Sequence, residues 1–176
     1  MSLAPPVFQY LLPHPALREY VRLFQLVGCQ FLAGMALPVK AYWPRPEQCL
    51  SFFPRDPERI AYGLDGSLLA SPQVRLYGQH VVATTRHVGR DFMVFQVVFQ
   101  PGALHRLTGL PADALTNTFV DAEAVFSSEI GQVSERLRNT EQPLEMVAVV
   151  EHFLAGLVGR AAPARPLDRV GALLLH

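Results

Sequence analysis

The sequence has few cysteines and few of the motifs that support covalent, redox or metal chemistry. It contains two cysteines among 176 residues, Cys29 and Cys49. Both fall in apolar segments, where small buried thiols are commoner than disulfides or metal ligands, so we predict neither. The sequence also lacks a Gly-rich phosphate loop, a Gly-x-Ser-x-Gly elbow and a Cys-x-x-Cys pair. No motif therefore indicates a nucleotide-binding enzyme, a serine hydrolase or a thiol oxidoreductase.

Long hydrophobic runs and an excess of charge of one sign are missing as well. The apolar runs are far shorter than a bilayer span, and the N-terminus lacks the layout of a signal peptide. We therefore predict a cytoplasmic protein that makes no contact with a membrane. Fifteen basic residues balance fifteen acidic ones, the single lysine is Lys40, and no basic stripe stands out. We expect no DNA binding by this chain alone, because such binding rests on clustered positive charge.

Half of the residues are hydrophobic, enough to build the core of one globular domain. The segment 89–107 organises the rest of the chain. Its strand presents Met93, Phe95, Val97 and Phe99 on one face, and Phe92, Val94, Gln96, Val98 and Gln100 on the other. A strand that is apolar on one face and nearly so on the other is typical of the centre of a sheet. Pro101 suits the first position of a helix, so we predict a helix from there.

Strands dominate before residue 101 and helices after it. Apolar residues at helical spacing over 17–24 predict a short N-terminal helix. Besides the central strand, short strands are predicted over 23–32, 48–53, 59–62, 67–69, 74–77 and 81–87, with a hairpin turn at 64–66. Seven or eight such strands are typical of an antiparallel barrel or sandwich. The predicted fold class is α+β, with the strands followed by a C-terminal helical segment.

Two longer helices are predicted in that segment. Over 126–138 a single apolar stripe indicates an ordinary amphipathic helix. Over 143–158 two stripes leave little polar surface, so we expect coverage by the core on one side and by a second subunit on the other. The predicted dimer-interface residues are Val150, Phe153, Leu154 and Leu157. The predicted organisation is a barrel with a short N-terminal helix (1–107), a helical dimerisation segment (108–160), and a linker with the start of a further helix (161–176).

One group of polar side chains is a candidate ligand-binding site. His80, Thr84 and Arg86 are predicted to share one strand face, and Gln96 and Gln100 lie on the less apolar face of the central strand. If both faces point inward, they place a few polar groups in an apolar barrel, as in many small-molecule sites. The alternative is that these side chains face solvent. We predict no metal and no cofactor, because the His-x-His pair and nearby carboxylate of a cupin metal site are absent.

Several segments taken in order resemble the N-terminal domain of AraC-type transcriptional regulators. They are Pro44–Phe53, Leu76–Gln79, the strand from Gly89 through Val98–Ala103, and Leu110–Leu115. The Phe99-x-Pro101-Gly102 sequence and the Leu-Pro-x-x-x-Leu segment after it are the most specific part. Two departures stand out: Ala103 replaces a common glycine, and no tryptophan occurs around 125–128.

The resemblance implies a cupin-like sensing and dimerisation domain. Its expected partners are a second copy of itself and an unidentified small-molecule effector, and DNA contact would come only from a C-terminal pair of helix-turn-helix units. No such pair follows within the 176 residues, so we expect a truncated fragment or, alternatively, a stand-alone domain. A cupin-type small-molecule-binding protein or enzyme is the second hypothesis, since one barrel can host either function. We favour the regulator and predict that the chain is not an enzyme.

Overall fold

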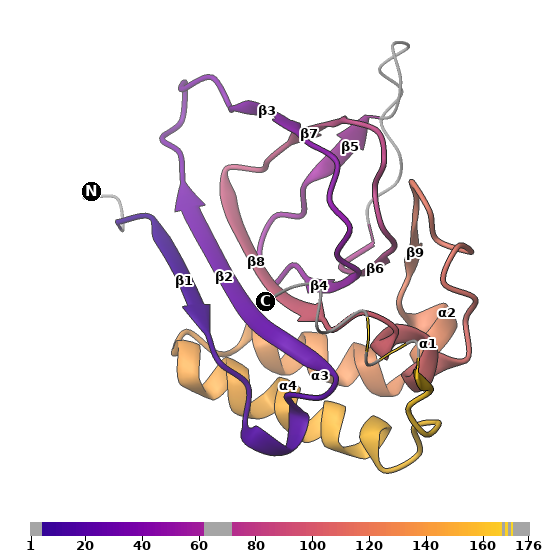
Figure 1. Cartoon of the computed structure of the whole chain (residues 1–176). Helices are drawn as coiled ribbons and strands as arrows, with labels where there is room; N and C mark the ends of the chain where they lie inside the picture. Colours follow the sequence, from indigo (N-terminus) through magenta and orange to yellow (C-terminus); the bar gives the residue numbers. More distant parts are fainter. Residues whose placement is uncertain (1–4, 62–71, 167, 169, 171–176) are drawn as a thin grey trace.

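The structure is a computed structural model that describes residues 5–61, 72–166, 168 and 170. In this part of the chain, two antiparallel sheets and a layer of helices form the fold (Figure 1). The six-stranded sheet has the order β1-β2-β8-β4-β6-β9, and the three-stranded sheet has the order β3-β7-β5. The strands are β1 (Val7–Leu11), β2 (Val21–Gln30), β3 (Val39–Tyr42), β4 (Cys49–Phe52), β5 (Arg59–Ala61), β6 (Val74–Tyr77), β7 (Thr84–His87), β8 (Asp91–Phe99) and β9 (Phe119–Asp121). The helices are the 3-10 helix η1 (Pro15–Leu17), α1 (Ala103–Thr108), α2 (Glu123–Phe126), α3 (Glu129–Arg138) and α4 (Pro143–Val158).

The predicted α+β class is confirmed. The described residues hold nine strands instead of seven or eight, because β1, β3 and β9 were not predicted as strands. Strand pairing within these residues gives two separate sheets, and it does not close them into one barrel. None of the described helices is both long enough and apolar enough to cross a membrane.

Strand β8 lies inside the six-stranded sheet, as its sequence predicts, and pairs with β2 and β4. Phe95, Val97 and Phe99 are buried in the main core, and Met93 packs against that core. The opposite face of β8 points toward the three-stranded sheet. The predicted alternation of β8 is therefore confirmed. One face of the strand packs in the main core, and the other face lines the space between the two sheets.

Helices α3 and α4 lie side by side on the core face of the six-stranded sheet (Figure 1). Apart from exposed Leu144 at the start of one stripe, the two apolar stripes of α4 pack within the same chain, because α4 also contacts α3 and η1 and because Phe153 packs edge-to-face on Phe126. The four predicted interface side chains, Val150, Phe153, Leu154 and Leu157, are all buried there. These residues are not on the surface that a second subunit would meet. The outer face of α4 instead carries Leu144, Ala148 and Ala155.

Two local predictions differ from the structure. The predicted helix over 17–24 is reduced to η1, because β2 already begins at Val21 and its backbone groups pair with β1 and β8. Helix α1 begins at Ala103 and not at Pro101, since Gly102 has the left-handed φ of 76°. The predicted strand 67–69 and turn 64–66 lie outside the described residues. The further helix predicted to start within 161–176 is described only in part, and residues 166, 168 and 170 are helical.

Candidate functional site

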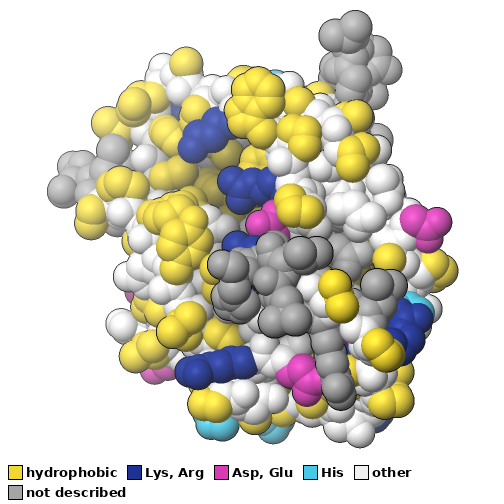
Figure 2. Space-filling model, in the orientation of Figure 1, with side chains coloured by type: hydrophobic (Ala, Val, Ile, Leu, Met, Phe, Trp, Pro, Cys, Tyr) yellow, Lys and Arg dark blue, Asp and Glu magenta, His cyan; other side chains and the backbone are white. Residues whose placement is uncertain are grey.

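The candidate site is a cavity between the two sheets. It has a larger lobe of about 270 Å³ and a smaller lobe of about 70 Å³. We call the two lobes together the intersheet cavity, because both are lined by Gln25, Tyr42, Arg45, Arg86 and Gln96. Figure 2 shows a largely hydrophobic face of the molecule that is hollowed, with several Lys or Arg side chains and an acidic one around the hollow.

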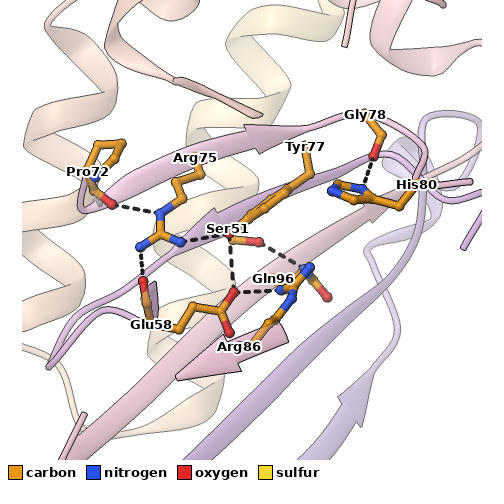
Figure 3. Close-up of polar contacts among 9 residues, drawn as sticks. All are labelled: Ser51, Glu58, Pro72, Arg75, Tyr77, Gly78, His80, Arg86 and Gln96. Atoms are coloured by element: carbon orange, nitrogen blue, oxygen red, sulfur yellow. Dashed lines mark hydrogen bonds and ion pairs between the residues drawn. The ribbon is translucent and has the colours of Figure 1, made fainter. Parts of the chain in front are cut away.

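A buried ion pair lies in the wall of the larger lobe. Arg86 on β7 donates from Nη1 to Oε1 of Glu58 at 2.6 Å (Figure 3). Only 10% of the Arg86 side chain and 8% of the Glu58 side chain are exposed. Removing both charges from water carries a large desolvation cost, and breaking such a pair is more costly still. The fold therefore keeps two charges here at an energetic cost.

Arg75 and Tyr77 on β6 hold Glu58 in place (Figure 3). Arg75 is fully buried and donates from Nη1 to Tyr77 Oη at 2.9 Å and from Nη2 to the Glu58 carbonyl oxygen at 2.5 Å. Tyr77 Oη in turn donates to Glu58 Oε1 at 3.2 Å. Burial raises the pKa of Tyr77, so its hydroxyl remains a donor. The Glu58 carboxylate is thus fixed from two sides.

Aromatic rings support the cationic side chains of the cavity. The Arg86 Cζ atom lies 3.6 Å from the centre of the Tyr42 ring, and the Arg45 Cζ atom lies 4.8 Å from the same ring. Behind the cavity wall, Arg75 stacks on Phe53 at 4.4 Å. Guanidinium groups over aromatic faces gain a cation–π contribution and lose side-chain freedom. The rings therefore fix the direction in which the charges point.

Two glutamines supply neutral polar groups on the opposite wall. Gln25 on β2 and Gln96 on β8 are directly opposite each other in the sheet. Gln96 Nε2 donates to Ser51 Oγ at 2.9 Å (Figure 3). Both amides line both lobes.

The far end of the larger lobe is apolar. Phe53, Val88 and Phe92 form a small buried cluster separate from the main core, and Val27 and Val94 pack against it. All five side chains line the larger lobe. The cavity therefore combines an apolar end with a charged wall, the usual composition of a site for a small organic molecule.

The structure brings three of the five predicted ligand-binding residues together. Arg86 and Gln96 line both lobes, and His80 lines the smaller one. His80 lies before β7 and not on it, and its Nδ1 is 3.1 Å from the Gly78 carbonyl oxygen. Burial, aided by Arg86 and opposed by the bond to Gly78, lowers the pKa of His80.

The other two predicted residues lie elsewhere. Thr84 shares a face of β7 with Arg86, but it is buried beside the cavity, and its Oγ1 has no hydrogen-bond partner among the described residues. Gln100 follows the end of β8, where its Nε2 donates to the Arg18 carbonyl oxygen at 3.2 Å. It lines a different hollow, next to Pro101 and Gly102. Gln100 is therefore not part of the intersheet cavity.

The sequence analysis missed Glu58, Arg75 and Tyr42. Glu58 follows a proline-containing turn, where no periodicity indicates which side chains point inward. On the predicted strand 74–77, Arg75 and Tyr77 alternate with Val74 and Leu76. This alternation does not indicate that both faces of the strand are buried, as they are in the structure. The available signal was the position of an arginine in a short strand flanked by apolar residues.

The described residues contain no group of three or more His, Cys, Asp or Glu side chains that could hold a metal ion. The arrangement found here instead offers charge pairing, hydrogen bonds and apolar contact.

Comparison with known proteins gives one match. No curated protein and no solved structure matches the chain. One family model matches residues 9–121, a segment that begins within β1, runs to the end of β9 and contains every described lining residue of the intersheet cavity except Phe8. Because this match spans more than half of the sequence, the chain belongs to the family described as domain of unknown function DUF6597.

Proposed function

We propose that this chain is the effector-sensing domain of an AraC-type transcriptional regulator, a cupin-like domain that binds a small molecule between its sheets and pairs with a second copy. The sequence resemblance supports the regulator class. The described residues support the binding role through the intersheet cavity. Contact with DNA would be made by a separate helix-turn-helix pair.

The observation that carries the proposal is the buried Glu58–Arg86 pair in the wall of a cavity whose far end is apolar. A structural core would be at least as stable with hydrophobic residues in place of such a pair. Charges held in a cleft by hydrogen bonds and aromatic rings are instead typical of a binding site. The network has this form, since Arg75 and Tyr77 position Glu58, and Tyr42 supports Arg86.

A second feature supports a role in signalling. Strand β8 lines the cavity with Gln96 and leads directly into α1, where Arg106 bonds to the segment that follows α4. The cavity wall is thus connected to the C-terminal end of the domain through β8, α1 and the hydrogen bond made by Arg106.

The binding role is tested by a thermal-shift screen of a metabolite library against the whole chain, with hits confirmed by calorimetry. Val94 lines the apolar end of the larger lobe, so Val94→Trp should fill it and abolish binding. The matched control is Val82→Trp, because Val82 is 48% exposed and does not line the cavity. Circular dichroism checks that both variants fold. Equal binding by the Val94→Trp variant would place the ligand elsewhere.

The regulatory role needs a second measurement. Residues 1–176 are joined to a DNA-binding domain that occupies its operator only as a dimer, and a reporter gene is placed under that operator. We expect repression of the reporter that changes when a confirmed ligand is added. The chain without the fused domain should leave the operator unoccupied, since its formal net charge is zero. A monomeric, ligand-insensitive fusion would contradict the regulator assignment and leave the binding role intact.

A further inference from the structure

Like charges face each other across the three-stranded sheet at the cavity. Lys40 on β3 and Arg86 on β7 are directly opposite partners, and both side chains line the larger lobe. Like charges at directly opposite positions destabilise a sheet. A protein tolerates this arrangement more readily when an anion sits near both cations.

The excess of positive charge extends around the whole cavity. Among the residues that the structure describes, the larger lobe is lined by three cations, Lys40, Arg45 and Arg86, and by one carboxylate, that of Glu58. In the smaller lobe, Arg22 is paired with Glu47 at 3.2 Å and Arg86 with Glu58 at 2.6 Å, which leaves the charge of Arg45 in excess there. The chain as a whole has a formal net charge of zero, so this is a local concentration of positive charge.

Glu58 does not cancel this excess. Its Oε1 atom already accepts from Arg86 and from Tyr77, and fully buried Arg75 lies directly behind it. Glu58 therefore binds Arg86 through its carboxylate and Arg75 through its backbone carbonyl oxygen. An incoming cation would meet a carboxylate that is already bonded, together with three positive side chains.

We propose that the intersheet cavity takes a small organic anion with a flat apolar body, such as an aromatic carboxylate. This inference rests on the proposed binding function and adds the class of ligand. The anionic group lies near Lys40, Arg45 and Arg86, where guanidinium and ammonium groups donate charge-assisted hydrogen bonds. The apolar body lies against the cluster of Phe53, Val88 and Phe92. The size of the cavity suits a ligand at the small end of the usual range for such sites.

The test compares acids with their neutral amides on the whole chain by calorimetry. The probes are benzoate and benzamide, cinnamate and cinnamamide, and 2-naphthoate and 2-naphthamide, with inorganic phosphate as an anion that lacks an apolar body. Any hit from the metabolite screen joins the panel with its neutral analogue. We expect at least one acid to bind about tenfold more tightly than its amide, and added salt to reduce that difference.

Two variants test which charges are responsible. Lys40→Met removes a cation that forms no hydrogen bond among the described residues, and it should weaken binding of the acid about fivefold without changing binding of the amide. Arg59→Met is the matched control, because Arg59 is an exposed cation on strand β5 of the same sheet and does not line the cavity.

Each other outcome has a defined meaning. If acids and amides bind equally and both are lost in Val94→Trp, the anion preference is wrong and the binding function stands. If Lys40→Met and Arg59→Met weaken the acid equally, the anion binds outside the cavity and the inference is overturned. If no compound from the panel or the screen binds, the proposed binding function fails as well.

Discussion

Arg106 and Ala162 exchange two hydrogen bonds. The Ala162 backbone N–H donates to the Arg106 carbonyl oxygen, and Arg106 Nε donates to the Ala162 carbonyl oxygen, each at 3.0 Å. The same guanidinium donates to Tyr20 Oη at 2.7 Å and to Glu19 Oε1 at 2.9 Å. One buried side chain of α1 thus connects the start of β2 with the segment after α4.

Replacing Arg106 should loosen that segment before it unfolds the domain. Arg106→Met removes three bonds from a charged donor, and we expect a loss of about 2–3 kcal/mol in the free energy of unfolding. Hydrogen exchange at Ala162 should accelerate more than exchange in the strands. Arg160→Met is the control, because Arg160 Nε makes one exposed bond within its own helix end. Unchanged protection of Ala162 in the Arg106 variant would show that this contact does not hold the segment.

The buried pair at the cavity should show strong energetic coupling. We expect Glu58→Gln and Arg86→Met each to cost about 3–5 kcal/mol, since each leaves a buried charged partner without its counter-charge. The double variant should cost less than the two single costs added, by at least about 1.5 kcal/mol. Urea unfolding of the four proteins measures this coupling.

The Arg22–Glu47 pair provides the comparison for that cycle. It has a longer contact of 3.2 Å, and 34% of the Arg22 side chain is exposed. Solvent screening should hold its coupling below about 1 kcal/mol. Equal coupling in the two cycles would mean that burial does not strengthen the Glu58–Arg86 pair.

The sequence predicts the part of the fold that depends on alternation. Residues 91–99 form a buried strand with the faces that the pattern indicates, and Phe95 and Gln96 point to opposite sides of the sheet as predicted. The burial of both stripes of α4 was not predictable, because a helical pattern does not show how many neighbours surround it. That burial depends on tertiary contacts with α3 and η1.

The candidate site could be predicted only in part for a similar reason. Arg86 and Gln96 lie on strands whose alternation is readable, whereas Glu58 comes from an irregular segment and is brought to Arg86 by the fold across 28 positions. His80 was grouped with Arg86 by counting along one strand, but the chain bends at residues 81–82 before β7 begins. The alternation of side chains between two faces holds only within a strand, so it cannot predict side-chain directions where the backbone bends.

Protonation of His80 should reduce stability in mild acid. Its folded pKa lies below the ordinary value of about 6.5, so the unfolded chain binds this proton more readily than the folded chain. The contribution of neutral His80 is thus fully present above about pH 6.5, and it is lost as the pH falls toward the folded pKa. His80→Gln removes the acid-dependent loss of stability that is due to His80. The other histidines are present in both proteins, so their effect cancels in the comparison. Urea unfolding at pH 7.5 and pH 5.5 should show a smaller pH effect in the variant, and equal effects would contradict the assignment.

Charge on the two faces of α4 should have opposite consequences. Val150 is fully buried, so Val150→Glu should cost more than about 4 kcal/mol and unfold the domain. Leu144 is 74% exposed, so Leu144→Glu should stay within about 0.5 kcal/mol of the wild-type stability. Circular dichroism and thermal unfolding measure both. A folded Val150→Glu variant would show that this stripe is not part of the core.

The same pair of variants bears on the proposed homodimer. If the dimer uses α4, the partner meets the outer face with Leu144, Ala148 and Ala155, and Leu144→Glu should give a folded monomer in sedimentation experiments. If Leu144→Glu remains a dimer, the interface lies on another element.

The two cysteines should differ in their reactivity toward iodoacetamide. Burial, with a smaller contribution from Glu47, raises the pKa of Cys49 to about 12, whereas the pKa of Cys29 is raised by burial and lowered by Lys40. At pH 8.5 only about three Cys49 thiols in ten thousand would be thiolates, the reactive form. Mass spectrometry of the native protein should therefore show labelling of Cys29 first. In urea the two thiols should react at similar rates. This control would show that the difference in labelling comes from the folded structure and not from the sequence around each cysteine. Labelling of native Cys49 before Cys29 would mean that the smaller lobe admits water and reagent freely, and it would argue against a desolvated site beside Arg86.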